Sequence, residues 1–254
     1  MRTAGTTRPE NAHAAAAGED FQSVCLVVVD PRLLVQALEH EHSRAAKLLS
    51  LLIYGLACVR TRALSDEYEA LERTYGRSVD AQQLAQVRKR VEHQHAAALR
   101  QKARVEDALE QFVSTELLLV TSPPLRRELR DIAQAVRADG CPRIHPHRVN
   151  HEIARCTWLP LYELDPAPFY LGRDRVSPRE YLIHTAVFAE SQILITEDDD
   201  LALPGDAYYR DPRTRRSARP YTLDEFFRDE LPFQLQFDAI DAPAVFRAAN
   251  SPGA

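Results

Sequence analysis

Two aspartates directly follow apolar runs of the sequence. Asp30 ends the run 24–29, and Asp198 lies two residues beyond Thr196, at the end of the run 193–196. Runs this rich in Val, Ile and Leu predict strands that are buried on both faces of a parallel sheet. Ligands bind at the carboxyl ends of such strands. If the two strands are neighbours, both carboxylates therefore lie in one crevice.

A third carboxylate belongs to the segment after the apolar run 117–121. Ser122 is a good N-cap and Pro123 suits the first helical position, so a helix is predicted to begin there. Glu128 falls in its second turn, from which the side chain can point back over the sheet edge, and Asp131 lies near the same face. Carboxylates that are brought together raise one another's pKa unless a cation shares them. Mg²⁺ or Mn²⁺ is the natural cation, because both take oxygen ligands.

The elements that must position these carboxylates alternate between strand and helix. The runs 24–29, 117–121 and 193–196 predict three strands, and residues 33–57 predict a helix after the first. This alternation indicates an α/β fold with a mainly parallel sheet.

Residues 65–116 differ in character, since they contain one glycine, no proline and many Glu, Gln, Arg and Ala. An apolar or small residue recurs every seven positions, which predicts one or two long helices with a heptad-like stripe. We interpret this segment as a helical insertion. Its helices pack either on their own domain or, as a homodimer, on a second copy of the chain. The stripe consists of Leu84, Val91, Ala98, Val105 and Phe112.

Composition predicts the remaining boundaries. Residues 1–20 are rich in Ala, Thr, Gly and charge and lack an apolar run, which predicts a disordered tail and no secretory signal. The sheet domain is expected in two parts, 21–64 and 117–220, on either side of the insertion. Residues 221–254 are expected to form an acidic C-terminal helix and tail. This last segment follows a basic loop predicted for residues 207–220.

Bulk charge and hydropathy exclude several classes of protein. Acids outnumber bases 37 to 32, which argues against strong sequence-independent binding of nucleic acid, although the acidic surplus lies mostly after residue 221. The uncharged stretch 48–59 is far shorter than the roughly 20 residues of a membrane span. The four cysteines show no CxxC spacing, which indicates reduced thiols in a cytoplasmic protein.

The order of these motifs resembles that of the PIN-domain nucleases. It is most similar to the larger bacterial branch grouped with toxins of toxin–antitoxin systems. The motifs are the run that ends in Asp30, the segment 122–129, and the predicted helix 181–188 that leads to the segment 193–201. The resemblance implies a PIN-like three-layer α/β/α sandwich that uses Mg²⁺ or Mn²⁺ to hydrolyse RNA.

The resemblance gives three acids a role position by position. Asp30 matches the family's first acid, Glu128 the second and Asp198 the last, so these residues would hold the metal ion. The resemblance covers about residues 24–60 and 117–230 and skips the insertion. It implies RNA as the substrate and an antitoxin protein as a partner.

The chain departs from the family pattern at two places. Arg179 stands where the fourth acid is expected, so Glu180 beside it, or Asp174 before it, would have to complete the site. Glu180 also fits a capping box at the start of its helix, which is a structural role. After Asp30 the chain has Pro and Arg where the family usually has Thr or Ser and then Asn. Arg32 would therefore lie near the site and could contact a phosphate.

Other residues of suitable chemistry receive weaker roles. Thr196 and Asp200 are expected to support Asp198. The acids in the segment 65–69 are rivals of Glu128, but no apolar strand precedes them. Cys141 and the histidines of segment 145–151 do not have the spacing of a standard zinc site.

Together with these carboxylates, the resemblance implies a metal-dependent ribonuclease that is the toxin component of a toxin–antitoxin system. Its catalytic and metal-binding residues are expected to be Asp30, Glu128, Glu180 and Asp198. The alternative is a catalytically degenerate PIN-like module that binds RNA or a partner protein through the helical insertion.

Overall fold

The computed structural model describes most of the chain between residues 23 and 251. The tail predicted for residues 1–20, Asp174, Cys141 and segment 145–151 lie outside the described residues. The described ranges are 23–74, 81–111, 113–135, 143–144, 178–188, 191, 193–201, 203, 207–210, 215–231 and 235–251.

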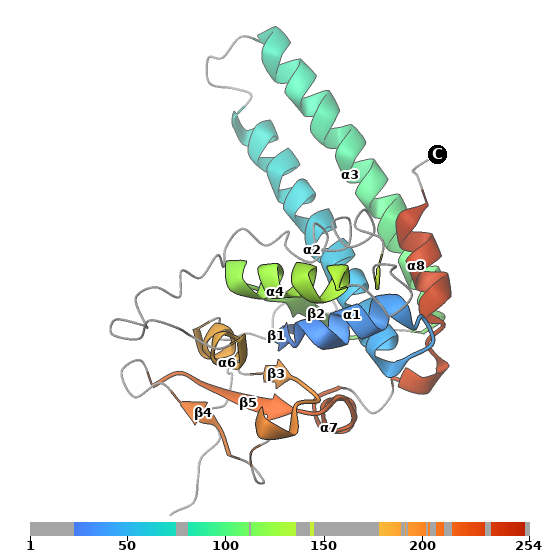
Figure 1. Ribbon diagram of the computed structural model, residues 1–254. Helices are drawn as coiled ribbons and strands as arrows, with labels where there is room; N and C mark the ends of the chain where they lie inside the picture. The colour runs from blue at the N-terminus through green and yellow to red at the C-terminus, as the bar shows by residue number, and fades with distance from the viewer. Residues whose placement is uncertain are drawn as a thin grey trace, which may run out of the picture.

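A five-stranded sheet in the order β2-β1-β3-β5-β4 forms the centre of the fold (Figure 1). β1 (Ser23–Val29) lies between β2 (Thr115–Leu119) and β3 (Ile193–Ile195) and is parallel to both. β5 (Ser217–Tyr221) continues the parallel sheet beside β3, and β4 (Tyr209–Arg210) is an antiparallel edge strand. The predicted α/β class with a mainly parallel sheet is therefore confirmed. β1 and β3 are neighbours, as the argument from Asp30 and Asp198 required.

Alternate residues of the strands face two separate hydrophobic cores, so helices cover both faces of the sheet. On β1, Val27 and Val29 belong to the larger core and Val28 to the smaller one. This separation makes the protein a three-layer α/β sandwich. The larger core contains α1 (Pro31–Glu39), much of α2 (Arg44–Thr74) and α8 (Ala242–Asn250), and the smaller contains α6 (Pro178–Phe188).

The single helix predicted for residues 33–57 is wrong, because the chain forms two helices there. His40 ends α1, and its backbone N–H still donates to the carbonyl of Gln36. The hydroxyl of Ser43 then accepts from the backbone N–H of Ala46 at 3.1 Å, which caps the start of α2. The helix stop and the new N-cap lie in the polar run 39–44, which separates the apolar parts of the two helices.

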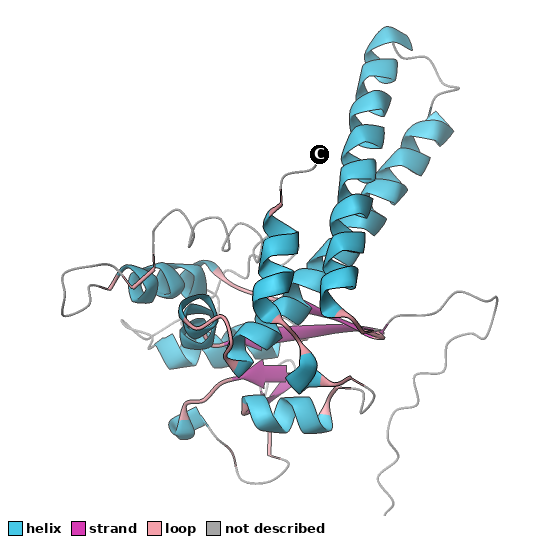
Figure 2. Ribbon diagram, turned by 90° about the vertical axis from the view of Figure 1, so that its right-hand side faces the viewer, coloured by secondary structure: helices cyan, strands magenta, loops and turns pink. Residues whose placement is uncertain are grey.

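Helices α2 and α3 (Ala81–Leu109) rise side by side from the sheet domain as a long arm (Figures 1 and 2). α2 begins in the core and continues into the arm without a break, so the boundary predicted between residues 64 and 65 falls inside a helix. β2 likewise begins two residues before the predicted end of the insertion. The arm is thus an extension of a core helix.

Three residues of the stripe with seven-residue spacing lie in α3 with described side chains, and all three are buried within the chain. Val91, Ala98 and Val105 are at most 3% exposed, whereas Val87 is 39% and Leu99 45% exposed. α3 packs against α2 and α8. The prediction that the helix pair packs on its own domain is confirmed for these residues.

α2 meets β2 closely at two points. A Cβ on Gly55 would lie 2.2 Å from the carbonyl oxygen of Leu117, so only glycine fits there. About two helical turns further on, nearer the arm, the guanidinium of Arg62 pairs in a bidentate manner with the fully buried carboxylate of Glu116. This contact anchors the arm at the sheet.

By length and composition alone, the segment Arg44–Leu71 of α2 passes the test for a membrane span. Its most apolar window is 61% buried inside the protein, as in a core helix of a folded domain.

The C-terminal part of the chain is more ordered than predicted. Thr222 and Glu225 form the expected capping box at the start of α7 (Leu223–Asp229). Beyond the 3₁₀ turn η4 (Phe237–Ala239), α8 packs on the arm instead of forming a tail. The basic loop predicted for residues 207–220 is also wrong in part, since it contributes β4 and most of β5 to the sheet.

Candidate active site at the carboxyl edge of the sheet

Asp30 directly follows β1 and is the N-cap residue of α1. Its backbone N–H donates to the carbonyl of Ile195 at 2.9 Å, which extends the pairing of β1 with β3 by one residue. Its Oδ1 accepts from the backbone N–H of Arg32 at 2.9 Å and so caps α1, with Pro31 in the first turn. The residue is 6% exposed. A strand and a helix thus fix this carboxylate from both sides.

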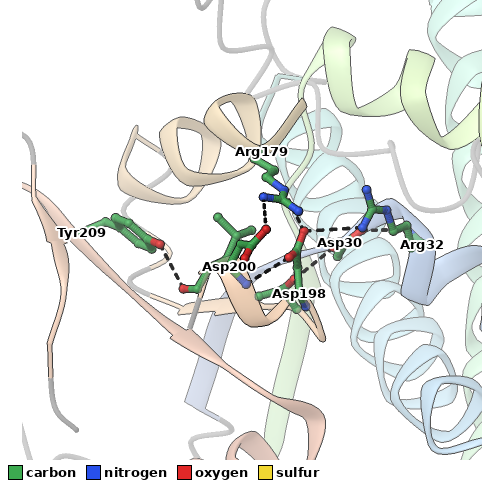
Figure 3. Close-up of polar contacts among 8 residues, drawn as sticks. Asp30, Arg32, Arg179, Asp198, Asp200 and Tyr209 are labelled. Atoms are coloured by element: carbon green, nitrogen blue, oxygen red, sulfur yellow. Dashed lines mark hydrogen bonds and ion pairs between the residues drawn. The ribbon is translucent and has the colours of Figure 1, made fainter. Parts of the chain in front are cut away.

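One hydroxyl connects Asp30 with the loop that carries Asp198. Thr196 Oγ1 donates to Asp30 Oδ2 at 3.0 Å and accepts from the backbone N–H of Asp198 at 3.1 Å. The pairing of β1 with β3 and of β3 with β5 places Thr196 there, since its own N–H donates to the carbonyl of Tyr221. Thr196 thus connects the two acids, which lie at one edge of the sheet (Figure 3).

Two arginines approach Asp198 from opposite sides (Figure 3). The Nε of Arg179, at the start of α6, lies 2.9 Å from Asp198 Oδ2, and the Nη1 of Arg32 lies 3.5 Å from the same oxygen. Arg179 also pairs through Nη1 with Asp200 Oδ2. The second oxygen of Asp198 accepts from the backbone N–H of Asp200 at 3.1 Å. Both carboxylate oxygens of Asp198 therefore have donors.

Glu128 lies on α4 (Pro123–Gln134), which follows β2. Its pKa is raised, first by partial burial and then by the negative charge of Asp30, while the charge of Arg32 lowers it and that of Asp131 raises it. The charge of Asp30 thus acts on Glu128, although no contact joins the two side chains among the described residues. Among the described residues, no hydrogen bond or ion pair neutralises its carboxylate.

The start of α4 is tied to α6 rather than capped in the predicted way. Ser122 stands at the N-cap position without a side-chain capping bond, and Pro123 is in the first turn. Instead, the buried hydroxyl of Thr185 on α6 donates to the hydroxyl of Ser122 at 3.0 Å. This contact holds the helix of Glu128 beside the helix of Arg179.

The acid predicted to complete the site is not the residue that reaches Asp198. Arg179 makes the contacts from the start of α6, whereas Glu180 lies beside it in the first turn with a half-buried side chain. The rival acids of segment 65–69 lie within α2, where Glu69 pairs with Arg73 on the exposed helix surface. The preference for Glu128 over that segment is therefore supported.

Two neighbours of Asp198 have contacts that their sequence context did not predict. Glu197 accepts from the backbone N–H of Leu223 at 2.8 Å and so helps to fix the start of α7. The hydroxyl of Tyr209 on β4 donates to the carbonyl of Leu201 at 3.0 Å (Figure 3). Together these bonds hold the turn η3 (Asp199–Leu201) against the sheet.

Within the part of the chain that the structure describes, no group of three or more His, Cys, Asp or Glu side chains is arranged to hold a metal ion. At Asp198, the guanidinium groups of Arg179 and Arg32 supply positive charge. The types of donor nevertheless fit a hard divalent cation: Asp30, Asp198 and Glu128 are carboxylates from three elements. Burial raises the pKa of Glu128 most, and the nearby charge of Asp30 adds to this effect.

Arg179 is the site residue that sequence reasoning treated only as a missing acid. The signal was present in the sequence, since an arginine at that position faces the acidic turn 198–200 once β3 and α6 are adjacent. Its ion pairs could be assigned only from the fold.

No protein-family model, curated protein or solved structure matches this chain.

Proposed function

We propose that this protein is a metal-dependent endoribonuclease with a PIN-like fold, which hydrolyses phosphodiester bonds of RNA at the carboxyl edge of its sheet. The observation that carries the proposal is the connection of two carboxylates from separate elements, with the carboxylate of Glu128 within electrostatic range of Asp30. Thr196 connects Asp30 with the loop of Asp198, and the charge of Asp30 raises the pKa of Glu128. Such a gathering of like charges at a ligand-binding edge is typical of a functional site.

Each side chain has a distinct part in the proposed reaction. Asp30, Glu128 and Asp198 would hold Mg²⁺ or Mn²⁺, with Thr196 fixing the orientation of the Asp30 carboxylate. The bound ion would supply Lewis-acid stabilisation of the charge that develops on the scissile phosphate and would favour ionisation of the attacking water. Arg32, whose side chain is 58% exposed beside the acids, would bind the RNA backbone through its planar guanidinium.

The resemblance to toxin components suggests the setting of this activity. A toxic ribonuclease would act on RNA in the cytoplasm and would be held inactive by an antitoxin protein. A homodimer through the helical insertion would have to use the faces of the arm that carry Val87 and Leu99, which are exposed. The stripe residues Val91, Ala98 and Val105 are already buried within the chain.

The activity is tested with purified protein, single-stranded RNA and Mn²⁺. We expect cleavage that a chelator stops and that Asp30→Asn abolishes, because an amide at this position removes the negative charge and one metal ligand. Asp199→Asn is the matched control, since Asp199 is exposed and makes none of the contacts described above. Equal cleavage by Asp30→Asn and the unaltered protein would contradict the proposal.

The second candidate is the catalytically degenerate PIN-like module, and the ion pairs of Arg179 with Asp198 and Asp200 favour it. In that case the guanidinium permanently replaces the metal ion, and the chain binds RNA or a partner protein without cleaving RNA. Retention of RNA without cleavage at any Mn²⁺ concentration would support this candidate over the first.

A further inference from the structure

Arg179 binds the acidic turn 198–200 at two points. Its Nε lies 2.9 Å from Asp198 Oδ2, and its Nη1 pairs with Asp200. The backbone N–H of Asp200 in turn donates to the other oxygen of Asp198. One guanidinium thus occupies the positive position at Asp198 that a divalent cation would need.

The two partners of this ion pair differ in their access to solvent. The side chain of Asp198 is 9% exposed, whereas that of Arg179 is 45% and that of Asp200 69% exposed. A phosphate that arrives from solvent can therefore contact Arg179 without a rearrangement of the fold. Guanidinium groups bind phosphate in a bidentate, charge-assisted manner, so RNA competes directly with Asp198 for this side chain.

Arg32 does not have the same position. Its contact with Asp198 is longer, at 3.5 Å, and its side chain is 58% exposed. It also approaches the acids from α1, which begins at the cap formed by Asp30. Removal of Arg32 would leave the Arg179 pair intact, whereas removal of Arg179 takes away the closer ion pair to Asp198.

We propose that Arg179 is a latch that couples RNA binding to metal binding. Without RNA, its guanidinium holds Asp198 and weakens the binding of a divalent cation. An RNA phosphate draws Arg179 away, which frees Asp198 for the ion. Because linkage is reciprocal, the ion must then strengthen RNA binding by the same factor. This inference rests on the proposed ribonuclease function and names the regulation of that site.

The latch is tested by calorimetric measurement of Mn²⁺ affinity, with and without a 2′-O-methyl RNA oligonucleotide whose integrity is checked on a gel. Without RNA, we expect Arg179→Gln to bind Mn²⁺ about three- to tenfold more tightly than the unaltered protein, the size expected when a partly exposed ion pair is removed. The oligonucleotide should tighten Mn²⁺ binding by the unaltered protein by a similar factor, and should have no such effect on Arg179→Gln.

Two further variants keep the test specific. Arg130→Gln makes the same change of charge at an exposed position of α4 and should leave Mn²⁺ affinity unchanged. Arg179→Glu supplies a carboxylate where the family pattern has one, and should bind Mn²⁺ at least as tightly as Arg179→Gln. Circular dichroism checks that each variant is folded.

The outcomes separate the latch from the function on which it rests. If Mn²⁺ binds to the unaltered protein and equally to Arg179→Gln, or if RNA tightens both alike, the latch is overturned while the ribonuclease proposal stands. If Mn²⁺ binds to none of the variants, Arg179→Glu included, both the latch and the proposed metal-dependent function fail.

Discussion

At the scale of single residues, the site depends on how each carboxylate oxygen is satisfied. Asp30 is held by the backbone N–H of Arg32 and the hydroxyl of Thr196, and Asp198 by a backbone N–H and guanidinium groups. Glu128 has no such partner among the described residues. A half-buried carboxylate without a donor costs stability when it is ionised, and functional sites commonly retain such groups.

The pKa of Glu128 leads to a pH-dependent prediction. Because its folded-state pKa is raised, ionisation destabilises the fold above that pKa, and this effect is absent below about pH 4, where the carboxyl is protonated in both states. Glu128→Gln should therefore increase the free energy of unfolding at pH 7, by less than about 1 kcal/mol because solvent screens the half-exposed group. The increase should disappear near pH 4.

Urea unfolding at several pH values measures this difference. Glu67→Gln, at an exposed position of α2, is the control and should show no pH-dependent gain. A Glu128→Gln variant that is less stable than the unaltered protein at pH 7 would show that the carboxylate has a stabilising partner, and would remove the argument for a cation there.

The sequence predicts the location of a site residue where the strand or helix that carries it can be recognised locally. Asp30 and Asp198 could be placed because a strand end and parallel pairing determine where they lie. Glu128 followed from the helix that Ser122 and Pro123 begin. Arg179 could not be assigned in this way, because its two ion pairs depend on how closely α6 approaches the turn after β3.

At the scale of secondary-structure elements, the arm depends on one buried face of α3. Val105 is fully buried between the arm and the core, and the same helix carries Val87 at 39% exposure. Val105→Ala should lower the free energy of unfolding by about 2 kcal/mol, from about 0.8 kcal/mol for each buried carbon removed plus the cavity that remains.

Denaturant titration measures both positions on the same helix. Val87→Ala removes the same two carbons from an exposed position and should change the free energy of unfolding by no more than about 0.5 kcal/mol. Equal losses at the two positions would mean that Val87 is also buried, as a homodimer through the arm would require. Size-exclusion chromatography with light scattering would then show a dimer.

Elements could be predicted where pattern and burial agree, and were missed where local chemistry conflicts with the pattern. The neighbouring strands β2, β1 and β3 consist largely of apolar residues, and the apolar runs identified them. β5 was not predicted because Arg219 and Pro220 are residue types typical of a loop, although Ala218 is fully buried in the sheet. The end of α1 was missed although the polar run 39–44 interrupts the apolar pattern, because that run contains no glycine or proline to mark a helix end.

At the scale of the whole molecule, the fold brings distant parts of the chain to one edge. Asp30, Glu128, Arg179 and Asp198 come from four separate segments, and the order β2-β1-β3 places their elements beside one another. The net charge of −5 argued against a general binder of nucleic acid. Three of the acidic residues, Asp30, Glu128 and Asp198, belong to this edge, where a divalent cation and the arginines would offset their negative charge.

The central proposal is that this edge binds a divalent cation between Asp30, Asp198 and Glu128. Anomalous diffraction from crystals grown with millimolar Mn²⁺ and the 2′-O-methyl RNA tests it most directly. We predict one strong anomalous peak about 2.0–2.2 Å from carboxylate oxygens of Asp30 and Asp198, the bond length of a small divalent ion, with Glu128 turned toward it. The account would be contradicted if no peak lies there and Arg179 remains paired with Asp198.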